Sequence, residues 1–136
     1  MIIQREIRLY PRSYGIHLIT DELTGQLPQF PQAGILHLFI KHTSAGLAIN
    51  ENADPSVRDD FEHFLDYLIP ENWSGYTHIM EGSDDMPAHI KSTLFGSSVS
   101  VPITNGRLNM GTWQGIYLGE FRRGKSQRTL VATIYS

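Results

Sequence analysis

The chain has 136 residues, of which 40% are hydrophobic and 18% charged, a composition typical of a globular protein and unlike that of a disordered one. Eleven Lys and Arg against fourteen Asp and Glu give a formal net charge of −3. This disfavours nucleic acid as a partner, because a phosphate-binding surface is usually basic. There is no cysteine, so disulfides and thiolate ligands are excluded, and a transition metal would need nitrogen and oxygen ligands.

The length and the hydropathy pattern predict one domain, residues 1–136, that is soluble and cytoplasmic. A chain of this length can bury one hydrophobic core without disulfides or structural metals. No apolar run approaches the ~20 residues needed to span a bilayer. The first residues also lack the basic and then apolar pattern of a signal peptide. We therefore expect no membrane partner.

Strand patterns predominate along the chain. Apolar and polar residues alternate over residues 3–10, which is typical of a half-buried strand. Residues 34–41 are almost continuously apolar and predict a central strand. A short helical turn is expected at residues 20–23, and an Asn-Gly hairpin turn at 104–107. Further strands are predicted at residues 15–20, 45–50, 98–103, 115–122 and 129–135.

Two longer helices interrupt these strands. Asp54 can cap the first helix and Pro55 suits its first position, while apolar residues at helical spacing continue to Leu68. The second helix is predicted from Met86, with Gly96 as its stop signal. This order predicts an α+β fold with a mostly antiparallel sheet. Because several strands are apolar on both faces and two helices are too few to cover them, we expect a neighbouring subunit to cover one face or edge.

The histidines suggest a metal site. His42, His78 and His89 each lie at the edge of a predicted element inside a polar cluster, unlike the other three, which lie within strand or helix patterns. Three neutral imidazoles can bind zinc and leave a fourth position open for water or substrate. However, the three lie on separate elements, so anion binding or ordinary hydrogen bonding are alternative roles.

Several other polar residues allow a functional and a structural interpretation. Asp85 precedes the second helix, where a carboxylate can be explained by the helix dipole alone. Glu120 shares a predicted strand face with apolar residues and can act as an acid or base, or pair with Arg122. Asn50 and Asn52 come just before the first helix, where they can form turns or contact a ligand.

Five polar blocks give the chain a family resemblance over essentially its whole length. They are His42-Thr43-Ser44-Ala45, Leu47-Ala48-Ile49-Asn50-Glu51-Asn52, Ala53-Asp54-Pro55, the run from Glu81 to Ser92, and the run from Gly111-Thr112-Trp113-Gln114 to Glu120. Together they closely resemble the YjbQ-like family, whose members are often described as secondary thiamine-phosphate synthases. The Gly-Thr-Trp-Gln block is the most specific of the five.

This resemblance implies an α+β fold, a closed homotrimer and a polar pocket near the subunit boundaries. It implies a weak enzymatic activity that joins a hydroxymethylpyrimidine pyrophosphate to a thiazole phosphate and releases pyrophosphate. His42, His78 and His89 would bind zinc, magnesium or a phosphate group, and Asp85, Glu120 and His89 would be catalytic. The residues that would contact a phosphorylated metabolite are Thr43, Asn50, Asn52, Lys91, Thr112, Gln114 and Arg122.

The cation content of these blocks keeps other functions open. A pyrophosphate leaving group usually needs magnesium and nearby Lys or Arg, yet the blocks and the residues that flank them contain few cations, chiefly Lys41, Lys91 and Arg122. Such a pocket suits zinc or neutral donors equally well. The chain also lacks a Gly-x-Ser-x-Gly elbow and a Walker loop. A trimer that only binds a phosphorylated metabolite and a metal-dependent hydrolase are therefore alternatives.

Overall fold

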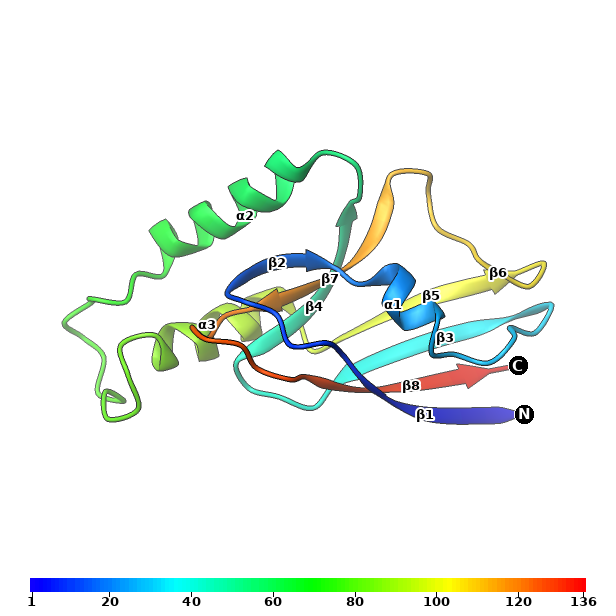
Figure 1. Cartoon of the computed structure of the whole chain (residues 1–136), viewed down its shortest axis with the longest axis horizontal. Helices are drawn as coiled ribbons and strands as arrows, with labels where there is room; N and C mark the ends of the chain where they lie inside the picture. Colours follow the sequence, from blue (N-terminus) through cyan, green and yellow to red (C-terminus); the bar gives the residue numbers. More distant parts are fainter.

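The computed structural model describes all residues from Met1 to Ser136 and contains two antiparallel sheets and three helices (Figure 1). Every strand pair is antiparallel. In chain order the elements are β1 (Ile2–Arg8), β2 (Gly15–Leu18), α1 (Thr20–Thr24), β3 (Ala33–Ile40), β4 (Ala45–Glu51), α2 (Pro55–Leu68), α3 (Asp85–Phe95), β5 (Ser98–Thr104), β6 (Arg107–Leu108), β7 (Gln114–Glu120) and β8 (Thr129–Tyr135).

The elements form three layers. The large sheet has the order β1-β8-β3-β5-β6, and the small sheet has the order β2-β7-β4. The main core lies between the two sheets and joins Leu36 and Leu38 of β3 to Leu47 of β4 and Leu118 of β7. On the other side of the small sheet, Tyr117 packs in a second cluster with residues of α3 and partly buried residues of α2. Side chains alternate along β7, so those on one face pack in the main core and those on the other face pack in the second cluster.

The predicted α+β fold and antiparallel pairing are confirmed, but the strands form two sheets where one was expected. Each predicted strand or helix agrees with the structure within two residues at either end. Asp54 caps α2 by accepting a hydrogen bond from the Ser56 backbone N–H at 2.9 Å. The Asn105-Gly106 turn has positive φ at both residues, as a tight hairpin requires. The sheets separate because residues 41–44 lead the chain from β3 out of the large sheet into β4 of the small one.

Two apolar surfaces are left open within one chain. The outer face of the large sheet exposes Ile35, Phe39 and Tyr135, each at close to half of its full area. Helix α2 has no fully buried residue and exposes Phe64 and Tyr67. The chain therefore presents apolar residues on both of its outer layers.

Three connections between the layers come together at one end of the small sheet. Residues 41–44 join β3 to β4, residues 96–97 join α3 to β5, and residues 121–128 join β7 to β8. Backbone hydrogen bonds tie them together: the Ile40 N–H donates to Ser97 O and the Leu47 N–H donates to Gly96 O, each at 2.9 Å. Gly96 has a φ of +120°, which favours glycine, and it ends α3 as predicted. This junction carries the candidate site.

No helix is both long and apolar enough to cross a membrane.

Candidate functional site

Two imidazoles and one carboxylate meet at the start of α3. Asp85 and His89 are four residues apart and so share one face of the helix, while His78 comes from the long connection between α2 and α3. Asp85 Oδ2 lies 2.6 Å from His78 Nε2 and 3.1 Å from His89 Nε2. The Asp85 side chain is 3% exposed, but those of His78 and His89 are 43% and 32% exposed. The three ligand-type atoms lie within 4.8 Å of one another, and the two imidazoles are partly exposed to solvent above the buried carboxylate; we call these three residues the trio.

The hydrogen bonds of His89 place two hydrogen-bond acceptors opposite each other in the trio. His89 Nδ1 lies 2.9 Å from the Thr43 carbonyl oxygen, which can only accept, so Nδ1 carries a proton. In a neutral ring, Nε2 then has a lone pair that faces the lone pairs of Asp85 Oδ2. Two acceptors at this separation need a proton or a cation between them. Nitrogen and oxygen atoms with free lone pairs are suitable ligands for a divalent transition metal such as zinc.

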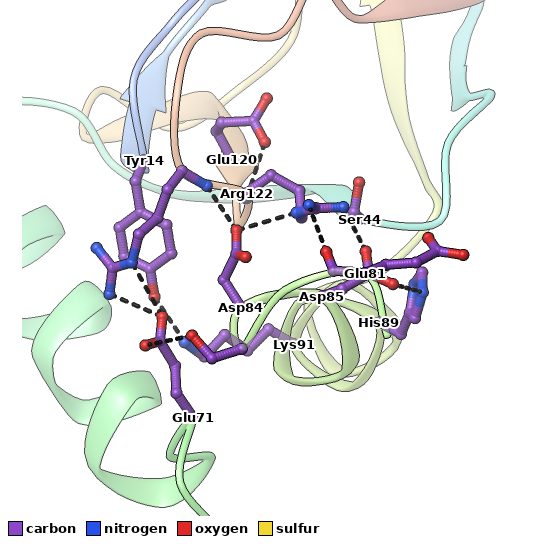
Figure 2. Close-up of polar contacts among 12 residues, drawn as sticks. Tyr14, Ser44, Glu71, Glu81, Asp84, Asp85, His89, Lys91, Glu120 and Arg122 are labelled. Carbon is purple, nitrogen blue, oxygen red and sulfur yellow. Dashed lines mark hydrogen bonds and ion pairs between the residues drawn. The ribbon is translucent and has the colours of Figure 1, made fainter. Parts of the chain in front are cut away.

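Arg122 binds the carboxylate of Asp85 through the oxygen that the imidazoles do not contact (Figure 2). Its guanidinium donates to Asp85 Oδ1, to Asp84 Oδ2 at 2.9 Å and to the Glu81 carbonyl at 3.2 Å. Burial works to raise the pKa of Asp85, but hydrogen bonding to His78 and the charges of His89 and Arg122 outweigh it and hold the pKa below its ordinary value. Asp85 is therefore ionised at neutral pH, with one oxygen paired to Arg122 and the other facing the imidazoles.

His42 lies beside the trio but does not join it. A polar cleft of about 530 Å³ opens next to His89 and is lined by His42 and hydroxyl side chains. His42 Nε2 accepts a hydrogen bond from the Thr129 backbone N–H at 2.9 Å, so this nitrogen is already occupied. Burial, and then the charge of Arg128, lower the pKa of His42, which favours the neutral ring. The predicted set of His42, His78 and His89 is thus not the one that the fold brings together, because Asp85 takes the place of His42.

Glu120 is not placed as an accessible acid or base, nor does it form the ion pair expected with Arg122. Its side chain is fully buried and receives two hydrogen bonds from Arg128, at 2.7 and 2.6 Å. Arg128 also donates to Ser44 Oγ at 2.9 Å. Arg122 contributes only its backbone N–H, at 3.1 Å. The strand alternation that indicated Glu120 says nothing of Arg128, which comes from an irregular segment of the chain.

Lys91 and Arg122 are the two predicted substrate contacts that carry charge, and both are committed to ion pairs. Lys91 Nζ lies 2.6 Å from the Tyr14 hydroxyl and 2.7 Å from Asp66 Oδ1, and its side chain is 3% exposed. It joins α3 to α2 and to the loop before β2. Lys91 therefore lies under the helix and not in the cleft. Arg122 is held by the two carboxylates that precede and begin α3.

The remaining predicted contacts divide between two places. Thr43 lines the cleft beside His89. Asn50, Asn52, Thr112 and Gln114 lie at the other end of the small sheet, where Glu51 pairs with Gln114. Six residue steps along β4 separate that pair from the Ala45–Glu120 pair next to the cleft, a distance of about 20 Å. One chain therefore does not bring all the family-motif residues into one pocket.

The sequence reasoning missed three hydroxyl residues of the cleft. Ser92 and Thr93 lie on successive positions of α3, and Ser97 follows its end. Ser92 stands inside a motif block, which was a usable signal. Nothing in the sequence marked Ser97, because its position depends on how the end of α3 meets β4.

The fold and the trio together define a small α+β protein with a histidine–carboxylate cluster where the small sheet meets the large one. The chain belongs to the UPF0047 protein YjbQ-like family, whose model matches residues 5–136. The family suggested by the motif blocks is thus confirmed.

Its relatives share both sequence and fold. The UPF0047 protein YjbQ of Escherichia coli O157:H7 is 47% identical over an alignment of 136 positions that covers 98% of this chain and 98% of that one. A conserved hypothetical protein from Thermus thermophilus has a TM-score of 0.81 at 32% identity, over 93% of this chain and 97% of that one. A protein of unknown function from Sulfolobus solfataricus has a TM-score of 0.84 at 23% identity, over 98% and 96%, which shows the fold alone.

Proposed function

We propose that this protein is a small cytoplasmic enzyme that holds a divalent cation on His78, Asp85 and His89 and acts on a phosphorylated metabolite. The observation that carries the proposal is the pair of facing acceptors, His89 Nε2 and Asp85 Oδ2, with His78 Nε2 beside them. Two histidines and a carboxylate with an open side are a ligand set that catalytic zinc sites use. A cation bound there would supply Lewis-acid stabilisation of negative charge.

The residues of the chain itself prepare this site. The Thr43 carbonyl fixes the tautomer and the orientation of His89, and Arg122 fixes the carboxylate of Asp85. Lys91 joins α3 to α2 through Asp66, without contacting a ligand atom of the trio. The partial exposure of His78 and His89 leaves a side open for substrate.

The reaction that the family resemblance suggests is a weak thiamine-phosphate synthase activity. It forms a carbon–nitrogen bond between a hydroxymethylpyrimidine pyrophosphate and a thiazole phosphate, and releases pyrophosphate. The purified protein, loaded with Zn²⁺ or Mg²⁺, is expected to form thiamine phosphate and to support growth of a strain without its own thiamine-phosphate synthase. Asp85→Asn should abolish both, and the exposed Asp59→Asn on α2 should not. Wild-type protein that binds the cation but forms no product would refute this reaction.

The proposal includes a homotrimer. The outer face of the large sheet exposes Ile35, Phe39 and Tyr135, which a second copy of the chain could cover. An interface of at least ~1,000 Å² is expected. Light scattering at micromolar concentration should give the mass of a trimer, and Phe39→Lys should lower it. A monodisperse wild-type monomer would contradict this part of the proposal.

A metal-dependent hydrolase is the second candidate, favoured by the open side of the trio. Three protein ligands and a solvent-facing position are what a zinc-activated water needs. A panel of phosphate esters incubated with the zinc-loaded protein distinguishes the two functions. Release of phosphate from one ester, lost in Asp85→Asn, would favour the hydrolase over the synthase.

A further inference from the structure

The cleft beside the trio contains hydrogen-bond donors but no Lys or Arg side chain. It lies between the 42–45 segment, the exposed side of α3 and the start of β5. The residues that line it are His42, Thr43, Ala45, His89, Ser92, Thr93 and Ser97.

Four cations lie close to the segments that form this cleft, and each is paired with a carboxylate. Lys41, which precedes His42, is paired with Glu6 at the surface, at 2.9 Å. Arg122 is paired with Asp84 and Asp85. Lys91 is buried against Asp66, and Arg128 is buried against Glu120. Arg122, Lys91 and Arg128 cannot turn to an anion in the cleft without breaking an ion pair. Moving Arg122 or Arg128 would also leave a buried carboxylate, Asp85 or Glu120, without its partner.

Three of the lining residues keep a donor that the chain itself does not use. The Ser92 and Thr93 hydroxyls donate to the backbone carbonyls of Thr43 and His89, at 2.7 and 2.8 Å. Thr43 and Ser97 are exposed, and neither hydroxyl forms a hydrogen bond within the chain. His42 accepts through Nε2, so in the neutral ring Nδ1–H is the remaining donor.

We propose that this cleft binds a phosphate oxyanion through His42, Thr43 and Ser97, and that binding requires a divalent cation on the trio. The proposal rests on the cation site proposed above. Neutral donors gain little over water when they bind an anion at an open surface. A dication next to the cleft supplies the missing attraction. Because Arg122 offsets part of the negative charge of Asp84 and Asp85, the site with its dication keeps a net positive charge beside the cleft.

The test uses Co²⁺ as the cation and inorganic phosphate as the anion. Visible absorption of the Co²⁺-loaded protein reports on the ligands of the metal, and calorimetry measures phosphate affinity with and without Co²⁺. We expect phosphate to change the Co²⁺ spectrum and to bind the metal-free protein at least about tenfold more weakly, the factor that corresponds to 1.4 kcal/mol. Equal phosphate affinity with and without Co²⁺ would overturn the proposal.

A matched set of variants locates the anion. Thr43→Val combined with Ser97→Ala removes two donors without touching the trio, and should weaken phosphate binding about tenfold while Co²⁺ affinity stays constant. Thr104→Val, at the far end of β5, should change neither affinity. If the double variant binds phosphate as the wild type does, the cleft is not the anion site, although the cation site stands. If the wild type binds no Co²⁺, both this inference and the proposed cation site fail.

Discussion

The two ends of the small sheet carry polar residues of the same family motifs but use them differently. At the cleft end, charged groups from three separate segments meet, and His89 Nε2 and Asp85 Oδ2 are left facing each other. At the other end, amide side chains bind the backbone of the loop that leads into β7. Asn52 Nδ2 donates to the Thr112 and Gln114 carbonyls, at 3.1 and 3.0 Å.

At the cleft end, polar atoms lack a partner within the chain, whereas at the other end the chain itself supplies the hydrogen-bond partners. Gln114 Oε1 accepts from the Gly111 backbone N–H at 2.7 Å and so closes the loop around Trp113, which is 65% exposed. Within one chain, the amide side chains at this end of the small sheet (the amide end) therefore fix the conformation of this loop. The cleft end, by contrast, has facing acceptors that require a proton or a cation.

The largest effect is expected where the cleft end depends on a buried charge. Arg128→Met leaves the fully buried side chain of Glu120 without its ion-pair partner. Breaking such a pair costs about 3–5 kcal/mol in the free energy of unfolding, measured by denaturant titration. Arg107→Met, which removes an exposed arginine on β6, should cost far less and serves as the control. Equal losses in the two variants would show that the Glu120–Arg128 pair does not support the fold.

A smaller loss is expected for Lys91→Met, and it separates support of the site from contact with substrate. The variant removes two hydrogen bonds that Lys91 Nζ donates, but Asp66 is partly exposed to water, so the cost should be about 1–3 kcal/mol. Co²⁺ affinity, measured by calorimetry, should change little, because the ligands of the trio remain. A stable variant that has lost substrate binding alone would mean that Lys91 leaves its buried position to contact the substrate.

At the amide end, Asn52→Ala should cost about 1–2 kcal/mol of unfolding free energy, since it removes two hydrogen bonds to the 112–114 loop. Its affinity for Co²⁺ should equal that of the wild type, because the length of β4 separates the two ends of the small sheet within one chain. A clear fall in Co²⁺ affinity in a monodisperse sample would show that the two ends work as one site.

The smallest effect concerns the protonation of His42. Burial and the charge of Arg128 lower the pKa of His42 from 6.5, so the folded ring stays neutral where the unfolded ring takes up a proton. This contribution to stability is complete above pH 6.5 and falls as the pH drops below it. The NMR titration of the ring should have its midpoint below 6.5. A midpoint above that value would contradict the Thr129 N–H bond to Nε2.

The sequence predicted the elements well because their signals are local. Asp54-Pro55 begins α2, Gly96 ends α3 and Asn105-Gly106 forms a tight hairpin, each through short-range backbone chemistry. The pairing of charges could not be predicted in the same way. Glu120 pairs with Arg128 instead of Arg122, because β7 ends where its continuation turns toward Asp84 and Asp85.

Residue types in the sequence indicate the candidate site, and the fold decides which of those residues lie together. His78, Asp85 and His89 all lie in polar clusters of the sequence, and so does His42, but the sequence does not show the backbone that surrounds His42 in the fold. The Thr129 N–H that occupies His42 Nε2 comes from β8, which is 87 residues away in sequence. Such long-range contacts decide which donors remain free, and no spacing rule contains them.

The account depends most directly on a cation bound by the trio. Calorimetric titration of the metal-free protein with Zn²⁺ or Co²⁺ should give one site per chain. Asp85→Asn and His89→Gln should each weaken that site by about a hundredfold or more, while Asp59→Asn should leave it unchanged. A folded wild-type protein that binds no divalent cation, or binds it equally well after Asp85→Asn, would contradict the account.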